Sequence, residues 1–310
     1  MRPVHVTVRR GADNDRMEIL ESPPSLADAL GGAWTLRRLG QSAFCETWEA
    51  RQGALRLFVK SAARQGAGAL RAEADGLRAI AATDCIRVPA VHALADLPGG
   101  GAALALEWLE FRTPDAGFGA RFGRALAALH GRPCPLEPAG FGWRSDNYVG
   151  ATPQRNTPLQ PAGRPGWIAF WSRSRLCAMR ERLPQDADEL RDAVNAVVER
   201  LPTFFTDGVQ PRPALIHGDL WQGNWDMLPD GTPVIFDPAV SCSDPEAEIA
   251  MMELFGSAPE GFRDAYEAEG GRWPTPERLR LYQLYHLLNH VVLFGGGYAA
   301  QALRVARALA

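Results

Sequence analysis

Residues 217–224 read His-Gly-Asp-Leu-Trp-Gln-Gly-Asn, and a later apolar run, residues 234–236, leads directly into Asp237. Asn224 follows Asp219 by five positions, and Asp237 follows Asn224 by thirteen. A short loop that ends at Asn224, followed by a strand that ends at Asp237, brings the second carboxylate back beside the first. The stretch therefore predicts one site made of two carboxylates and an amide.

Phosphoryl transfer from a nucleotide needs these three groups. One carboxylate orients the attacking hydroxyl and accepts its proton, while an amide oxygen and a second carboxylate hold Mg²⁺ against the β- and γ-phosphates. The separations resemble those of the catalytic Asp, the metal-binding Asn and the metal-binding Asp of protein kinases. We therefore expect an ATP-dependent enzyme in which Asp219 is the base and Asn224 and Asp237 bind the metal. The alternative, a polar loop before a buried strand, is disfavoured because all three positions match.

The composition is that of a globular protein with enough apolar residues for a core: 310 residues, 46% of them hydrophobic, with a formal net charge of -3. This charge gives no reason to expect nucleic acid or an anionic membrane as a partner. The apolar stretches are short, and the first residues lack the apolar core of a signal peptide, so we expect a cytoplasmic protein without a membrane span. The five cysteines are scattered and outside any metal-ligand spacing, which predicts reduced thiols.

The pattern along the chain predicts an α+β fold with two lobes, residues 25–109 and 110–310, after an N-terminal extension, residues 1–24. The first lobe is a small antiparallel sheet, in which residues 55–60 and 102–109 are expected strands and residues 66–82 an inserted helix. The second lobe is mainly helical, with one short strand pair near residues 214–237. Its expected helices are residues 118–130, 188–201, 245–256 and 275–294. Residues 140–170 are rich in Pro, Gly, Asn and Gln and are expected to form a long functional loop.

Further motifs resemble the fructosamine and ketosamine kinase family, which has the bilobal protein-kinase-like fold of aminoglycoside and choline kinases. The matching motifs are Phe58–Lys60, Arg87–Pro89, Asp96–Gly101, Asp146–Gly150, Pro153–Gln154, Leu215–Asn224, Phe236–Ala239, Glu253–Gly256, Tyr282–Tyr285 and Leu288–His290. The resemblance covers the chain from about Ser25. It implies phosphorylation of a ketosamine, such as fructosamine or ribulosamine, at the third hydroxyl of its sugar, on a free amine or on the lysines of glycated protein.

Nucleotide-binding residues are expected in the first lobe. Lys60 ends a strand, where its ammonium can contact the α- and β-phosphates, and Glu73 lies at the edge of the buried helix face, where it can pair with Lys60. Gly40 and Ser42 belong to the loop expected to cover the phosphates, although this loop has one glycine where protein kinases have three. Cys45, at the end of that loop, is expected to be a buried thiol.

The junction of the lobes is expected to bind adenine. Glu107 and Leu109 would contact the base through their backbone groups, and Trp108 could pack either between the lobes or against adenine. On the acceptor side, Trp221 lies two residues after the base and is expected to form a wall for the sugar, while His217 is expected to brace the loop. The other acceptor candidates are Asn147, Gln154, Asn289 and His290, for each of which a structural hydrogen bond is the alternative.

Two other functions remain possible on the sequence alone. An aminoglycoside or choline kinase would share the base and metal pattern, but a choline-like ligand favours a cage of several aromatic residues with acids, whereas Trp221 and the polar 140–170 segment favour a sugar. A nucleotide-binding pseudokinase that acts as a sensor would have lost Lys60 or one of the base and metal residues. The preferred sugar and the oligomeric state are not predicted.

Overall fold

The computed structural model describes residues 24–42, 44–159 and 163–310. The predicted N-terminal extension therefore lies outside the described residues, apart from Pro24, where helix α1 (Pro24–Leu30) begins. Contacts divide the chain into two compact units. The first contains the residues up to Asp115 together with Trp225–Asp237, and the second contains Ala116–Asn224 together with Pro238–Ala310. Each predicted lobe was one continuous stretch of the chain. The first unit differs, because it also includes Trp225–Asp237, which the sequence had assigned to the second lobe.

The first unit is built on a five-stranded antiparallel sheet in the order β1-β2-β3-β5-β4. Its strands are β1 (Thr35–Gln41), β2 (Glu46–Gln52), β3 (Leu55–Ala62), β4 (Val91–Leu97) and β5 (Gly101–Glu107). Strand β3 is central, because it pairs with β2 on one side and with β5 on the other, where Lys60 lies opposite Leu104. The β-forming residues of β3 and its central place explain why it is buried along most of its length.

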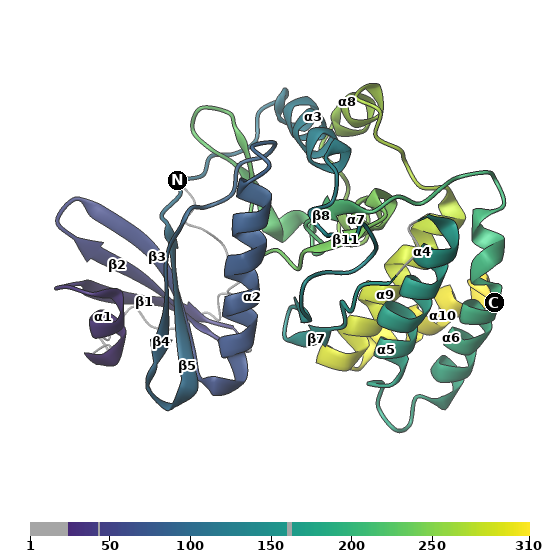
Figure 1. Cartoon of the computed structure of the whole chain (residues 1–310), viewed down its shortest axis with the longest axis horizontal. Coiled ribbons are helices and arrows are strands. Elements are labelled where there is room, and N and C mark those ends of the chain that lie inside the picture. Colours follow the sequence, from purple (N-terminus) through teal and green to yellow (C-terminus); the bar gives the residue numbers. More distant parts are fainter. Residues whose placement is uncertain (1–23, 43, 160–162) are drawn as a thin grey trace. The chain divides into compact units, whose positions relative to one another are not determined.

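Each face of this sheet is covered by one helix, and Figure 1 shows α1 and α2 (Arg64–Ala81) on opposite sides of the strands. Successive side chains of a strand point to opposite faces. Leu57 and Val59 pack in a cluster with Leu26 of α1. Phe58 and Lys60 consequently face the other side, and Lys60 contacts Glu73 of α2 there.

A short hairpin of β9 (Trp225–Met227) and β10 (Pro233–Ile235) completes the first unit. The Arg112 N–H donates to the carbonyl of Met227, and Ile235 donates to the carbonyl of Arg87. The rings of Phe111 and Phe236 stack with centroids 5.5 Å apart. These bonds fix the strand that runs into Asp237 to the sheet-bearing unit.

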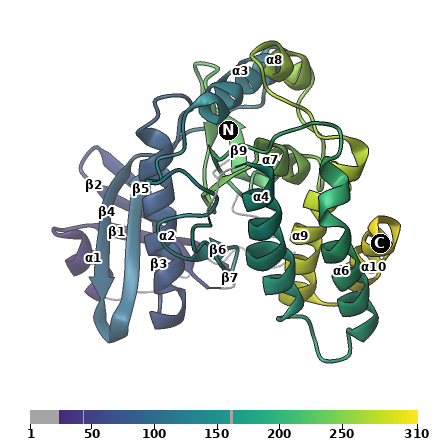
Figure 2. The same ribbon diagram turned by 45° about the vertical axis from the view of Figure 1, so that its right-hand side comes forward.

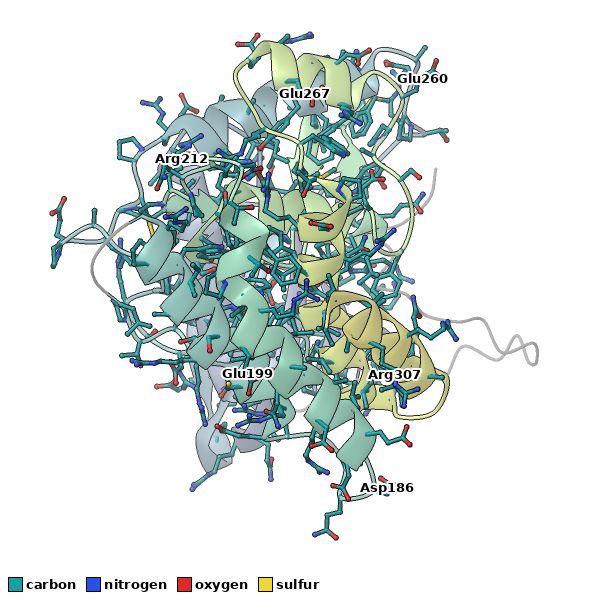
Figure 3. The ribbon with its side chains drawn as sticks, turned by 90° about the vertical axis from the view of Figure 1, so that its right-hand side faces the viewer. Asp186, Glu199, Arg212, Glu260, Glu267 and Arg307 are labelled. Carbon is teal, nitrogen blue, oxygen red and sulfur yellow. A yellow bond between two sulfur atoms is a disulfide. The ribbon has the colours of Figure 1, made fainter. Side chains whose placement is uncertain are left out.

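The second unit is mainly helical. Its helices are α3 (Phe118–Gly131), α4 (Arg164–Phe170), α5 (Ala178–Arg180), α6 (Asp188–Arg200), α7 (Pro245–Met252), α8 (Phe262–Ala268), α9 (Pro276–Phe294) and α10 (Gly297–Leu309). A π-helical segment, Trp171–Cys177, joins α4 to α5. Helices α4, α6, α9 and α10 run alongside one another (Figure 2), and Figure 3 looks onto α6 and α10, which carry the labelled Glu199 and Arg307. Their shared core contains Trp167, Trp171, Tyr282 and Tyr285.

Two strand pairs of this unit lie near the candidate site. Strand β8 (Ala214–Ile216) leads into the 217–224 stretch and pairs with β11 (Ser241–Ser243). Residues 140–170, predicted to be a loop, instead contain the hairpin β6 (Asn147–Val149) and β7 (Thr152–Gln154) and the helix α4. Strands of three residues carry too little pattern to be predicted. None of the described helices is long and apolar enough to cross a membrane.

Candidate active site

A buried ion network in the first unit joins three predicted residues. The Lys60 ammonium donates to both carboxylate oxygens of Glu73, at 2.8 and 2.9 Å, and to Oδ1 of Asp237 at 2.6 Å. Burial alone would lower the pKa of Lys60, but the attraction of Asp237 and Glu73 outweighs it and the pKa is raised. Lys60 is therefore a fixed cation.

Asp237 adopts a backbone conformation that its residue type rarely takes, with φ at 60°. A strained residue persists only where its surroundings hold it, and such residues gather at functional sites. Here Asp237 is held by the strand before it and by Lys60. About a third of its side chain, 33%, is exposed, so the carboxylate remains accessible to an ion or a ligand.

An apolar pocket of the first unit begins at Asp237. It is lined by Phe58, Pro89, Leu106, Glu107, Leu109, Phe111, Phe236 and Asp237. These side chains present apolar faces, and the ion network lies at one end of the pocket. The Glu107 N–H donates to the carbonyl of Ala90 at 2.9 Å. This N–H is therefore already used within the first unit. Trp108 does not line the pocket, because its ring packs under the Arg56 guanidinium, 3.6 Å away.

The predicted phosphate loop closes on itself. Ser42 donates from its backbone N–H to the carbonyl of Cys45 at 2.8 Å, and its hydroxyl also contacts Cys45. Gly40 lies in β1 next to a register shift opposite Thr47. Cys45 is buried, and desolvation raises the pKa of its thiol, which favours the unreactive thiol form, as expected for a packed cysteine. A phosphate role for Gly40 and Ser42 stays a prediction.

The loop that carries Asp219 is anchored by a residue that the sequence patterns did not single out. Fully buried Glu248 of α7 accepts from the N–H groups of His217 and Gly218, each at 2.7 Å. Its carboxylate also contacts Nε2 of His130 at 3.3 Å. Desolvation would raise the pKa of Glu248, but the His130 hydrogen bond and nearby charges outweigh it and lower the pKa. Glu248 therefore stays ionised and fixes the loop before Asp219.

Glycine at position 218 is required by the same arrangement. Its φ of 83° is in the left-handed region, and a Cβ built there would lie 2.2 Å from the carbonyl oxygen of Ala239. The N–H of Ala239 in turn donates to the carbonyl of His217 at 2.8 Å. Asn224 closes the far end, since its amide Nδ2 donates to the carbonyl of Asp219 at 2.8 Å. The side-chain oxygen of Asn224 then points away from that bond as a possible metal ligand.

Trp221 is half-buried and is not one of the core tryptophans. Its six-membered ring lies directly over Gly223, because a Cβ built on Gly223 would be 2.3 Å from Cζ2 of that ring. Only glycine leaves room for this orientation. Half-burial disfavours the core interpretation of Trp221, and its role as a wall for the sugar stays a prediction.

Asn147 and Gln154 are buried and make structural hydrogen bonds. The Asn147 amide donates to the carbonyl of Val240 at 2.8 Å, and Gln154 donates to Oδ1 of Asn147 and to the carbonyl of Ala239. Tyr285 of α9 donates to Gln154 at 2.7 Å. These bonds support the segment after Asp237 and favour the structural interpretation of both residues.

Asn289 and His290 lie near the end of α9. Asn289 is buried, and its Nδ2 contacts the carbonyl of Val149 at 3.5 Å. His290 places Nδ1 2.8 Å from the carbonyl of His286, so Nδ1 carries the proton and Nε2 is an acceptor. Burial lowers the pKa of His290. A neutral imidazole can accept a hydrogen bond from a hydroxyl.

The cysteine prediction was wrong for one pair. Cys134, which follows α3, and Cys242 in β11 form a disulfide, with their Cα atoms 5.8 Å apart. Among the described cysteines, Cys45, Cys85 and Cys177 lie outside this disulfide. Residues 108 positions apart give no spacing signal, because only the fold brings them together.

Comparison with known proteins identifies the family. The fructosamine kinase family model matches residues 34–310. A Synechocystis protein named as a probable ketoamine kinase is 40% identical over 253 residues, 81% of each chain. The ketosamine-3-kinase of Mus musculus is 32% identical over 275 residues, which cover 82% of this chain and 88% of the relative.

Solved structures agree with the predicted fold. A Thermobifida fusca protein described as a fructosamine-3-kinase is 30% identical with a TM-score of 0.75, covering 92% of this chain and 96% of that one. An aminoglycoside phosphotransferase has a TM-score of 0.62 at 16% identity, covering 92% and 96%, which shows a shared fold. The α+β protein-kinase-like fold is thus confirmed. The family match over most of the chain shows that this protein belongs to the fructosamine kinase family.

Proposed function

We propose that this protein transfers the γ-phosphate of ATP to the third hydroxyl of the sugar of a ketosamine. The fructosamine kinase family and the ketosamine-3-kinase relative support an ATP-dependent phosphotransferase with an alcohol group as acceptor. Fructosamine, ribulosamine and the glycated lysines of proteins are the acceptors proposed. This family assignment favours a ketosamine over an aminoglycoside or choline.

The observation that carries the proposal is the Lys60 network. One ammonium bonds to the carboxylate of Glu73 on α2 and to Asp237, which follows β10. This strand comes after residues 217–224, the loop with the proposed base Asp219, which we call the base loop. Kinases need this pairing, because the lysine contacts the α- and β-phosphates while the aspartate would hold the metal ion that offsets phosphate charge. The adjoining apolar pocket offers a place for adenine.

Asn224 and Asp237 are the proposed ligands of Mg²⁺. An amide oxygen and a carboxylate are hard donors of the kind that Mg²⁺ prefers, and the accessible Asp237 side chain and the orientation of Asn224 fit that role. When bound, the ion neutralises charge on the phosphates. Lys60 would hold Asp237 in place, and Asp219 would orient the acceptor hydroxyl and take its proton.

The test is an assay of ADP release with ribulose-, erythrulose- and fructose-amines, beside an aminoglycoside and choline. We expect turnover only with the ketosamines, and phosphorus and carbon NMR of the product should place the phosphate on the third carbon of the sugar. The Asp219→Ala variant should bind ATP normally yet lose most turnover, because the nucleotide groups lie in the other unit. Turnover of choline or an aminoglycoside alone, or normal kcat in Asp219→Ala, would contradict the proposal.

A further inference from the structure

Four aromatic side chains gather at the end of α9. Phe255 follows α7, His290 and Phe294 are one turn apart on α9, and Tyr298 lies in the first turn of α10; we call this group the aromatic patch. The His290 ring lies 4.6 Å from Phe255, 4.9 Å from Tyr298 and 5.4 Å from Phe294 between centroids. Phe294 is 65% exposed, and the other three rings are half-buried. The patch therefore offers ring surface to solvent.

The aromatic patch continues from the loop that carries the base. Gly256 follows Phe255 directly, and a Cβ built on Gly256 would lie 3.2 Å from Oε1 of Gln222. Gln222 is the next residue after Trp221, the proposed sugar wall. The residue that follows Phe255 therefore lies beside the Gln222 side chain of this loop, within the same compact unit.

The chemistry of the aromatic patch is apolar and uncharged. Residues 291–303, which include Phe294 and Tyr298, contain no Asp, Glu, Lys or Arg. Burial lowers the pKa of His290, which favours the neutral imidazole, although the Nδ1–H bond to the His286 carbonyl acts in the opposite direction. Ring faces attract cations as well as apolar groups, and a neutral imidazole does not repel an ammonium.

A ketosamine has matching chemistry beside its reactive hydroxyl. Its nitrogen is attached to the first carbon of the sugar, two carbons from the third, and carries a positive charge when protonated. With the third hydroxyl at Asp219 and the sugar along Trp221, the substituent on nitrogen leaves the site close to the base loop. This step rests on the proposed function.

We propose that the aromatic patch binds the substituent on the ketosamine nitrogen, and that the enzyme therefore prefers ketosamines whose amine carries an apolar or aromatic group. The ammonium lies against the ring faces and the apolar substituent covers Phe294. A substituent that carries a carboxylate gains nothing from these rings and loses hydration. The preferred substrate class is the ketosamine of an apolar amine.

The experiment compares two substrates of one sugar, the fructosamine of phenethylamine and that of glycine, with three variants. Phe294→Ser removes an exposed ring, and Phe294→Tyr keeps a ring. Leu55→Ser is the matched control, because Leu55 is the other large hydrophobic residue that is exposed in the described chain, at 45%, and it lies in the first unit. We expect Phe294→Ser to lower kcat/KM for the phenethylamine substrate roughly three- to tenfold. The kcat/KM for the glycine substrate and the KM for ATP should stay unchanged.

Phe294→Tyr should keep the preference for the phenethylamine substrate over the glycine substrate. Leu55→Ser should leave kcat/KM unchanged for both substrates. Equal losses for both substrates with Phe294→Ser, or no loss, would overturn the inference while leaving the proposed kinase activity intact. A wild-type enzyme that phosphorylates neither ketosamine would instead remove the proposed function and this inference with it.

Gel filtration adds a check on the same variant. A dimer that Phe294→Ser converts to a monomer, with unchanged substrate preference, would show that the aromatic patch is a contact between copies. That result would also overturn the inference.

Discussion

Replacing Glu248 by glutamine tests whether the base loop is held in place from α7. The carboxylate of Glu248 accepts two backbone N–H groups, from His217 and Gly218, both at 2.7 Å. Glutamine has one accepting oxygen, and its amide nitrogen can only donate. One loop N–H therefore loses its bond and faces another donor at a buried position.

The expected loss follows from these bonds. A hydrogen bond to a charged group contributes about 1.5–3 kcal/mol, and an unpaired buried donor costs about 1–3 kcal/mol. We expect Glu248→Gln to lower the free energy of unfolding by about 2–4 kcal/mol, a fall in Tm of roughly 3–6 °C for a chain of this size. The kcat should fall about a hundredfold, because a shift of about 1 Å at a reacting group has that effect.

The pH dependence gives a second readout of the same residue. Because the fold lowers the pKa of Glu248, its stabilising contribution is complete above the ordinary value of 4.5 and is lost as the pH falls through the lower folded pKa. The Glu248→Gln variant lacks this group. The difference in Tm between wild type and variant should therefore shrink in acid.

Glu246 provides the matched control for this measurement. It is also fully buried on α7, but its carboxylate pairs with Arg272 and Arg278 rather than with the loop. Glu246→Gln should lower Tm to a similar extent while the folded enzyme keeps nearly normal kcat. The KM for ATP should change in neither variant, since Lys60 lies in the other unit. Normal kcat in Glu248→Gln, or an equal loss in Glu246→Gln, would refute a specific role of Glu248 in positioning Asp219.

Three further outcomes are expected. Trp221→Ala should lower kcat/KM for a ketosamine about tenfold to a hundredfold. The Tm should change little, because the ring is half-buried. A large fall in Tm with normal affinity for the acceptor would show that Trp221 is structural. Gly223→Ala should mimic this loss, since a Cβ would displace the ring, and unchanged acceptor KM would contradict that coupling. Asp237→Asn should weaken Mg²⁺-dependent ATP binding, measured by titration calorimetry with and without the ion, because a neutral amide supplies less charge; identical titrations would remove Asp237 from the metal site.

The sequence predicted the elements whose residues repeat a pattern over several turns or strands. Strand β3 alternates, and α2 places Glu73 at the edge of its buried face, so the pair with Lys60 could be anticipated. Residues 217–224 were assigned a role because phosphoryl transfer needs fixed residue types at fixed separations, and that role stays a prediction. The hairpin of β6 and β7 was missed, because Asn147 and Gln154 sit in strands of only three residues, where polar composition indicated a loop.

Partners distant in sequence could not be predicted from local pattern. Cys134 and Cys242 meet only because β11 returns beside the segment after α3. Glu248 did leave a signal that was available in the sequence. The residues around Glu248 in its helix include Ala, Ile and Met, which indicates a buried helix. An acid at such a position needs hydrogen-bond donors. That requirement predicts a partner for Glu248 but does not say which.

Helix α7 links the loop before Asp219 to helix α9 through two acids. Residues two apart on a helix point in different directions. Glu248 consequently reaches the loop before Asp219, while Glu246 bonds to Arg278 in the first turn of α9. Gln283, further along α9, donates to the carbonyl of Ala250 at 3.2 Å and ties the two helices again. Because the last turns of α9 carry His290 and Phe294, α7 helps to fix the distance from Asp219 to the aromatic patch within the second unit.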